Sequence, residues 1–124
     1  MKGYVIFAAW VIGTTLNSPF DLRALGDAEI AMAVVGRSLR TAPDAESGND
    51  QFGENFEVGG GYMLSGNIAP LFGRYAIKAG LLCVKGPRAG CRRVFKDVYG
   101  RLYLERVVGT GPSGPIRYVA EPLR

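Results

Sequence analysis

The residue types that most often perform acid, base or metal chemistry are sparse in this chain. Its 124 residues contain no histidine and two cysteines, which excludes imidazole general-base catalysis, a Ser-His-Asp triad and the commonest zinc and haem sites. Two carboxylates can form an acid/base pair, and four lie close together in the sequence: Glu46, Asp50, Glu54 and Glu57. Three of these fall in a polar segment without apolar anchors, so we predict a mobile acidic loop at residues 41–55 and no catalytic residues.

A glycine-rich segment near the end of the chain matches a nucleotide-binding pattern. Residues 109–114 fit G-x-G-x-x-G. That pattern binds a pyrophosphate only where a helix begins at it, and Pro112 and Pro115 oppose a helix. We therefore predict a loop there. We expect no cofactor and no metal site, and the sequence favours a protein that is not an enzyme.

The best candidates for function are cationic and aromatic side chains in the second half of the chain. Residues 1–73 hold four basic and eight acidic side chains, whereas residues 74–124 hold eleven basic and three acidic ones. A positive half raises the local concentration of anions. The predicted anion- or partner-binding residues are Arg74, Arg88, Arg92, Arg93, Lys96 and Arg101, with aromatic contacts from Tyr75, Tyr99 and Tyr103. The alternative is that the rings lie in the core and the arginines are only solvated.

One helix and a set of strands must position these residues. Residues 27–36 predict a short helix that Asp27 caps and Gly36 ends. Ile30, Ala33 and Val34 share one of its faces. Apolar and polar residues alternate from position 56 onward, which predicts strands at 56–64, 74–78, 81–85, 91–96, 101–108 and 116–121.

Short turns at 79–80 and 97–100 join the predicted strands as sequential neighbours. We therefore expect an α+β, β-rich fold. In it, one short N-terminal helix packs on a curled antiparallel meander of five to six strands.

The two cysteines flank a predicted turn centred on Pro87. A hairpin there places Cys83 directly opposite Cys91, near the separation that a disulfide tolerates. Free core thiols and part of a metal site are the competing interpretations. The even number of cysteines, together with an N-terminus that resembles an export signal, favours a Cys83–Cys91 disulfide.

The first twenty residues have the layout of a secretory signal peptide. Lys2 precedes an uncharged apolar run at residues 4–12, which is too short to span a bilayer. Gly13 and Thr15 make a poor cleavage site, so a buried first element or an uncleaved anchor is the alternative. We expect residues 1–20 to be a signal peptide and 21–124 a single β-rich domain without a transmembrane segment. The expected location is periplasmic or secreted, and cytoplasmic if residues 1–20 are not a signal peptide.

Two segments, GRYAIKAGLLCV (73–84) and CRRVFKDVYGRLY (91–103), resemble a family of small exported alphaproteobacterial proteins of unknown function. Its pattern is a short helix, then an aromatic hairpin with a cysteine pair and a D-x-x-G turn. The resemblance covers about residues 25–105 and implies export and a disulfide. It implies no activity.

These observations lead to three hypotheses of function. The first is a non-catalytic exported β domain that binds an anionic envelope component or an acidic partner through a basic face. The second is a small nucleic-acid-binding module, which we regard as less favoured and whose affinity would depend strongly on salt. The third is a periplasmic enzyme inhibitor of the lysozyme-inhibitor type, for which a positive face has the wrong sign against a basic lysozyme.

Overall fold

The fold is an antiparallel β structure with one short helix. A computed structural model describes residues 21–43, 52–66, 69–109 and 114–123, so the predicted signal peptide lies outside the described residues. The elements are β2 (Arg23–Ala24), α1 (Asp27–Val34), β3 (Arg37–Thr41), β4 (Gly53–Phe56), β5 (Gly61–Ser65), β6 (Leu71–Lys78), β7 (Leu81–Lys85), β8 (Gly90–Lys96), β9 (Leu102–Gly109) and β10 (Ile116–Pro122). None of the described residues forms a helix long and apolar enough to cross a membrane.

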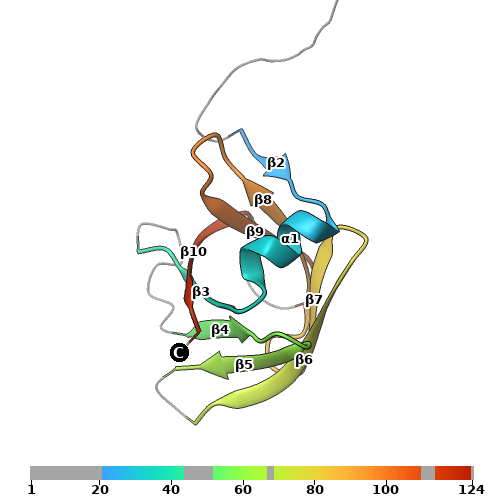
Figure 1. The fold of residues 1–124 in the computed structure, drawn as a ribbon, viewed down its shortest axis with the longest axis vertical. Coiled ribbons are helices and arrows are strands. Elements are labelled where there is room, and N and C mark those ends of the chain that lie inside the picture. Colours follow the sequence, from blue (N-terminus) through green and yellow to red (C-terminus); the bar gives the residue numbers. More distant parts are fainter. Residues whose placement is uncertain (1–20, 44–51, 67–68, 110–113, 124) are drawn as a thin grey trace, which may run out of the picture.

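The sheet closes on itself into a barrel (Figure 1). Each strand from β3 to β10 pairs with the next strand along the chain, β10 returns to pair with β3, and β2 adds a ninth strand beside β8. The predicted antiparallel, β-rich class is therefore confirmed. The predicted curled meander of five to six strands is wrong, because eight strands form a closed barrel.

Two strands that sequence patterning missed make the closure possible. β3 and β4 bury polar side chains, among them Ser38, Glu54 and Asn55, so neither strand has a plain apolar alternation. The buried Asn55 has a partner on a neighbouring strand, since its Nδ2 donates to the Met63 carbonyl at 3.1 Å. The single strand predicted at 56–64 is in fact a hairpin, with β4 ending at Phe56 and β5 beginning at Gly61. Residues 44–51 of the predicted mobile loop lie outside the described residues.

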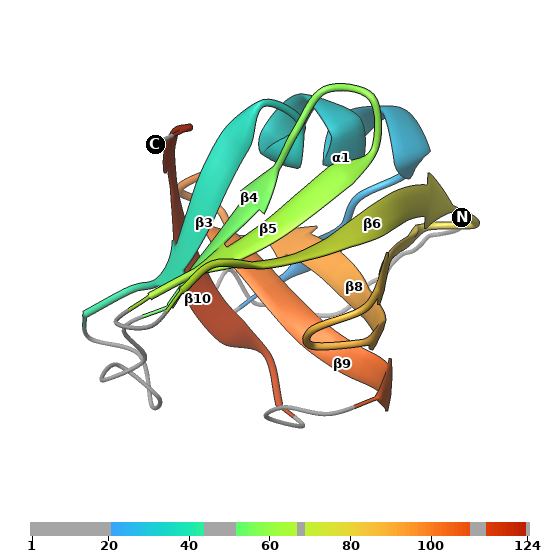
Figure 2. The ribbon, with the colours of Figure 1, turned by 90° about the horizontal axis from the view of Figure 1, so that it is seen from below.

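Helix α1 lies across one end of the barrel, which we call the helix end (Figure 2). Its Ile30 and Val34 are fully buried, as the predicted apolar face requires. Gly26, not Asp27, is the N-cap residue, and the Glu29 carboxylate accepts the Gly26 N–H at 3.3 Å. Asp27 instead accepts the Gly80 N–H at 2.6 Å, which ties the start of the helix to the β6–β7 turn.

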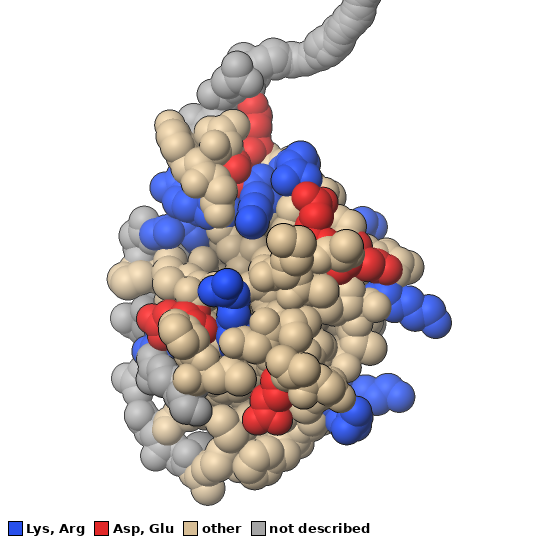
Figure 3. Space-filling view, in the orientation of Figure 1, with Lys and Arg blue, Asp and Glu red and all other residues tan. Residues whose placement is uncertain are grey.

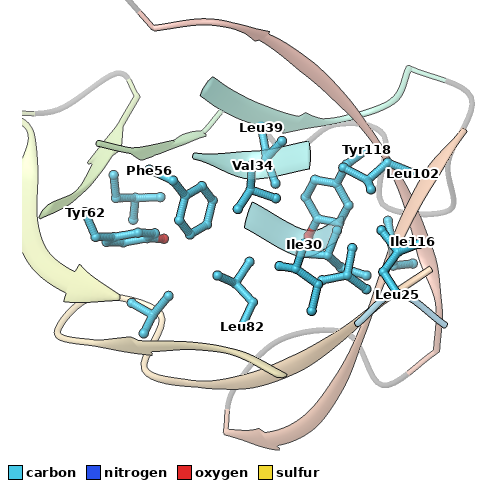
Figure 4. Close-up of a cluster of buried hydrophobic side chains, with 14 residues drawn as sticks. Leu25, Ile30, Val34, Leu39, Phe56, Tyr62, Leu82, Leu102, Ile116 and Tyr118 are labelled. Carbon is cyan, nitrogen blue, oxygen red and sulfur yellow. The ribbon is translucent and has the colours of Figure 1, made fainter. Parts of the chain in front are cut away.

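The core fills the barrel between α1 and the strands (Figure 4). Inward side chains from α1, β3, β4, β5 and β7 meet those from β9 and β10, and the ring of Phe56 packs edge-on against Tyr62 at 5.3 Å between centroids. A charged group also enters the interior, since Glu54 is 1% exposed and alternates with the neighbouring Asn55, so that it shares the inward face of β4 with Phe56. A barrel of this size is packed with side chains and is not a channel.

The turn and disulfide predictions at the β6–β7–β8 hairpins are confirmed. Cys83 and Cys91 are register partners on β7 and β8 and form a disulfide. The tight turn at Ala79 and Gly80 has φ of 54° and 75°, and Gly100 closes the β8–β9 turn at φ 79°. β7 spans Leu81–Lys85, within the predicted bounds. The β4–β5, β6–β7 and β8–β9 turns all lie at the helix end, because consecutive strands run in opposite directions.

Candidate anion-binding site

The six cations predicted to form one basic face occupy three different environments. Arg88 and Arg92 contact Glu54 in the barrel interior. Arg74 and Arg93 are exposed on β6 and β8. Lys96 and Arg101 line a pocket at the helix end. The basic half of the sequence is therefore divided between the core, the outer wall and the mouth of the barrel.

The interior pair is built around one buried carboxylate. Arg92 donates from Nη1 to Glu54 Oε2 at 3.0 Å and from Nη2 to Oε1 at 2.6 Å. The Tyr62 hydroxyl donates to the same Oε1 at 2.8 Å, and Arg88 lies 3.6 Å from Oε2. Arg92 is only 14% exposed in its side chain. Its charge is thus satisfied inside the protein, which removes it from the set that an external ligand can contact.

Burial and pairing shift the titration of this cluster. Burial opposes ionisation of Glu54, but Arg92 holds the pKa of Glu54 below its usual value. Burial and then the Glu54 charge raise the pKa of Tyr62 well above its ordinary value. For Arg92, burial acts against the charged form, but Glu54 outweighs it and raises the pKa of the guanidinium. At neutral pH the cluster is one carboxylate, two guanidiniums and a neutral phenol.

The outer-wall cations have only weak local partners. Arg74 Nη2 donates to the Gly59 carbonyl at 3.3 Å. Arg93 is the register partner of Leu81 on β7 and of Glu105 on β9. Lys85 is exposed at the end of β7, on the opposite end of the barrel from α1. These side chains are spread over exposed strand positions and do not border the described pocket.

A pocket of about 370 Å³ opens at the helix end, between α1 and the strands of the barrel mouth. Its lining residues are Met32, Ala33, Arg37, Lys96, Gly100, Arg101, Leu102, Arg117, Tyr118, Val119 and Ala120. Figure 3 shows Lys and Arg side chains around a hollow beside α1 on this face. Among these lining residues four are cationic and none is acidic.

Strand register directs two of these cations toward the mouth of the barrel. Lys96 is the register partner of the buried Leu102, and register partners share one face of a sheet. Arg37 is likewise the partner of the buried Phe56. Lys96 is the last residue of β8 and Arg37 is the first residue of β3. An inward side chain at either position therefore reaches the rim of the barrel. Neither forms an ion pair within the described part of the chain.

The β8–β9 turn fixes the third lining cation. Asp97 accepts hydrogen bonds from the backbone N–H of Tyr99 and of Arg101, both at 2.9 Å, and from Arg101 Nε at 2.7 Å. Burial alone would raise the pKa of Asp97, but these donors and the Tyr103 hydroxyl lower it. The guanidinium of Arg101 also lies 5.0 Å from the centre of the Tyr99 ring. Arg101 is therefore held rigidly at the pocket edge.

The three tyrosines predicted as aromatic contacts also lie in different environments. Tyr99 is 70% exposed on the β8–β9 turn. Tyr103 is half-buried and its hydroxyl donates to Asp97 at 3.2 Å. Tyr75 is half-buried, donates to the Glu57 carbonyl at 2.7 Å and packs edge-on against Phe56. Only Tyr99 presents most of its ring to solvent.

Sequence reasoning missed two lining cations and the buried acid. Arg37 directly follows Gly36, which the sequence indicated as the helix end, but the short strand after it was not recognised. Arg117 lies within a predicted strand but is not among the predicted anion-binding residues. The sequence predicts Glu54 in the acidic loop, whereas it is a buried residue of β4. In the described ranges, no group of three or more cysteine and carboxylate side chains is arranged to hold a metal ion.

Comparison with known proteins gives no relative for this chain. No family model, curated protein or solved structure matches it.

Proposed function

We propose that this protein is a non-catalytic, exported binding domain that takes an anionic group into the basic mouth of its barrel. The observation that carries the proposal is the inward direction of Arg37 and Lys96 at the rim of the pocket. Two cations directed at one recess, without an acidic lining residue, create a local positive potential that favours an anion.

The shape of the site favours a small anionic group over a broad acidic surface. The pocket volume of about 370 Å³ falls within the range of small-ligand sites, which combine apolar walls with a few placed polar groups. Leu102, Val119 and Ala120 supply apolar wall here. A phosphate or carboxylate carried by an envelope component fits this combination. The disulfide is compatible with the oxidising compartments outside the cytosol.

A titration with inorganic phosphate tests the proposal. We expect the NMR signals of Arg37, Lys96 and the surrounding backbone to shift in a saturable manner, and the affinity to fall with added salt. The double variant Arg37→Met/Lys96→Met removes both inward charges and keeps most of each apolar stem. We expect its affinity for phosphate to fall by about tenfold or more.

Lys85→Met/Arg93→Met is the matched control, because it also removes one lysine and one arginine, here from exposed wall positions away from the pocket. We expect the control to bind phosphate as the wild type does. The absence of saturable shifts would overturn the proposal. An equal loss of phosphate affinity in both double variants would also overturn it. That result is expected from non-specific attraction by net charge, which is how the nucleic-acid hypothesis explains the basic residues.

A further inference from the structure

We infer that the helix end is a membrane-docking surface that receives an anionic lipid headgroup in the pocket and inserts the apolar side chains around it into the bilayer interface. This inference rests on the proposed anion site and names the carrier of its anion. It comes from the exposed apolar residues beside the pocket, which the anion site alone does not explain.

Exposed large apolar side chains lie at both ends of the barrel: Leu71, Phe72, Val107 and Val108 at the end away from α1, and Met32, Val58, Val98 and Tyr99 at the helix end. Met32 on α1 is 79% exposed, and Val58 in the β4–β5 turn is 81% exposed. In the β8–β9 turn, Val98 is 56% and Tyr99 70% exposed. Of these two sets, the one at the helix end borders the described pocket, which makes it the candidate site for a protein or a membrane.

The positions of these side chains relative to the pocket favour a membrane. Met32 itself lines the pocket, and Tyr99 directly precedes the lining residues Gly100 and Arg101. Apolar side chains thus border a recess that contains Arg37 and Lys96. A bilayer interface presents the matching arrangement, since anionic headgroups lie directly above an apolar layer.

The chemistry of the individual side chains agrees with this arrangement. Tyr99 has an apolar ring with a polar tip, and such rings are enriched at membrane interfaces. Arg101 lies against that ring and Lys96 has a long apolar stem, so both can keep their charges at the headgroup level. Three acidic groups near this end pair with cations: Glu29 with Arg23, Glu121 with Arg40, and Asp97 with Arg101.

The test uses the chain in the form that its host produces, mixed with vesicles of phosphatidylcholine alone or with an equal part of phosphatidylglycerol. We expect co-sedimentation with the anionic vesicles to exceed that with the neutral ones by about tenfold or more. We expect Arg37→Met/Lys96→Met to lose most of this preference and Lys85→Met/Arg93→Met to keep it.

A local probe then reports which end of the barrel enters the bilayer. Tyr99→Trp introduces an indole at the helix end, and Phe72→Trp introduces one on β6 at the other end, where Phe72 is also 70% exposed. With bromine-labelled anionic lipids, we expect Tyr99→Trp to show a blue shift and quenching beyond those of the parent chain. We expect Phe72→Trp to show no such excess. The parent chain corrects for Trp10 wherever residues 1–20 are retained.

The outcomes separate this inference from the proposed function. Phosphate binding without an anionic vesicle preference would keep the anion site and overturn membrane docking. Equal quenching of the two introduced indoles, or none at Tyr99→Trp, would overturn the proposed orientation. Vesicle binding that survives Arg37→Met/Lys96→Met would overturn the role of the pocket in docking. An acidic protein partner would leave all vesicle measurements at the level of phosphatidylcholine, which also contradicts the inference.

Discussion

Glu54 on β4 and Arg92 on β8 face each other across the barrel interior and form a two-contact ion pair. Their four charged atoms meet at 3.0 Å and 2.6 Å, although the residues are 38 positions apart in the sequence. Three strands, β5, β6 and β7, separate β4 from β8 around the barrel wall. The pair therefore connects opposite walls of the closed barrel, and Tyr62 and Arg88 complete its contacts.

Removing one partner of this pair is expected to destabilise the fold strongly. Arg92→Met leaves a buried carboxylate without its main partner, which costs about 3–5 kcal/mol in the free energy of unfolding. Urea denaturation followed by far-UV circular dichroism measures the change. Arg93→Met is the control, because Arg93 is exposed and we expect a change within about 0.5 kcal/mol. Glu54→Gln/Arg92→Met should be more stable than Arg92→Met; a double variant that is no better would contradict an electrostatic origin.

The Tyr62 hydroxyl is expected to stabilise the fold up to alkaline pH. Tyr62→Phe removes a hydrogen bond to a charged acceptor, at a cost of about 1.5–3 kcal/mol at neutral pH. Burial and Glu54 raise the pKa of Tyr62 above 10.0 in the folded state. Its contribution is therefore fully present below pH 10 and is lost as the pH rises above that value.

Unfolding experiments at increasing pH check this expectation. The stability difference between the wild type and Tyr62→Phe should stay constant from neutral pH to about pH 10 and then shrink. Tyr99→Phe, at an exposed ring, should change stability little throughout. A difference that stays constant well above pH 10, up to the pH at which the barrel unfolds, would count against the buried hydrogen bond.

Asp97 is expected to contribute stability that acid removes. Asp97→Asn weakens the bonds that hold the β8–β9 turn, and we expect a loss of about 1–2 kcal/mol at neutral pH. Hydrogen bonds lower the pKa of Asp97 below 3.8 in the folded state. The contribution is present above that pH and disappears as the pH falls through the folded-state pKa. Thermal unfolding of both proteins between neutral and acidic pH measures this, and curves that remain parallel into strong acid would argue against it.

The Cys83–Cys91 disulfide is expected to stabilise the fold by constraining the unfolded chain. For so short a loop the chain-entropy model gives about 2.5 kcal/mol. Cys83→Ser/Cys91→Ser should lower the free energy of unfolding by that amount without changing the far-UV spectrum. Adding reductant to the wild type should produce a similar loss and should have no effect on the variant. Insensitivity of the wild type would contradict the contribution of the bond.

Export is expected to lower the intact mass of the protein, because it removes the signal peptide and allows the disulfide to form. Protein recovered from its native host without reductant should lack roughly 15–22 N-terminal residues and should carry two hydrogens fewer than the reduced chain. An uncut chain with free thiols would remove the support for export. It would also return residues 4–12 to the list of segments that pack in the folded protein.

Local chemistry made several elements predictable. The helix, the turns at 79–80 and 97–100 and the five later strands follow from glycine positions and from the alternation of apolar residues, which are properties of neighbouring positions. The cysteine pair was predictable for the same reason, since a single hairpin brings the two residues together. β3 and β4 were not, because their buried side chains include Ser38, Glu54 and Asn55. Such side chains look like loop residues until their partners are known.

The sequence by itself determined the β-rich class, the absence of histidine chemistry and the positive charge of the second half. Only the tertiary structure decided where each charge is used. Closure of the barrel brought Arg92 to Glu54, and the strand register turned Lys96 and Arg37 toward the mouth. The physical reason is that a one-position shift in register moves a side chain from one face of a sheet to the other. Composition records how many cations a chain has, and pairing between distant strands fixes which of them a ligand can reach.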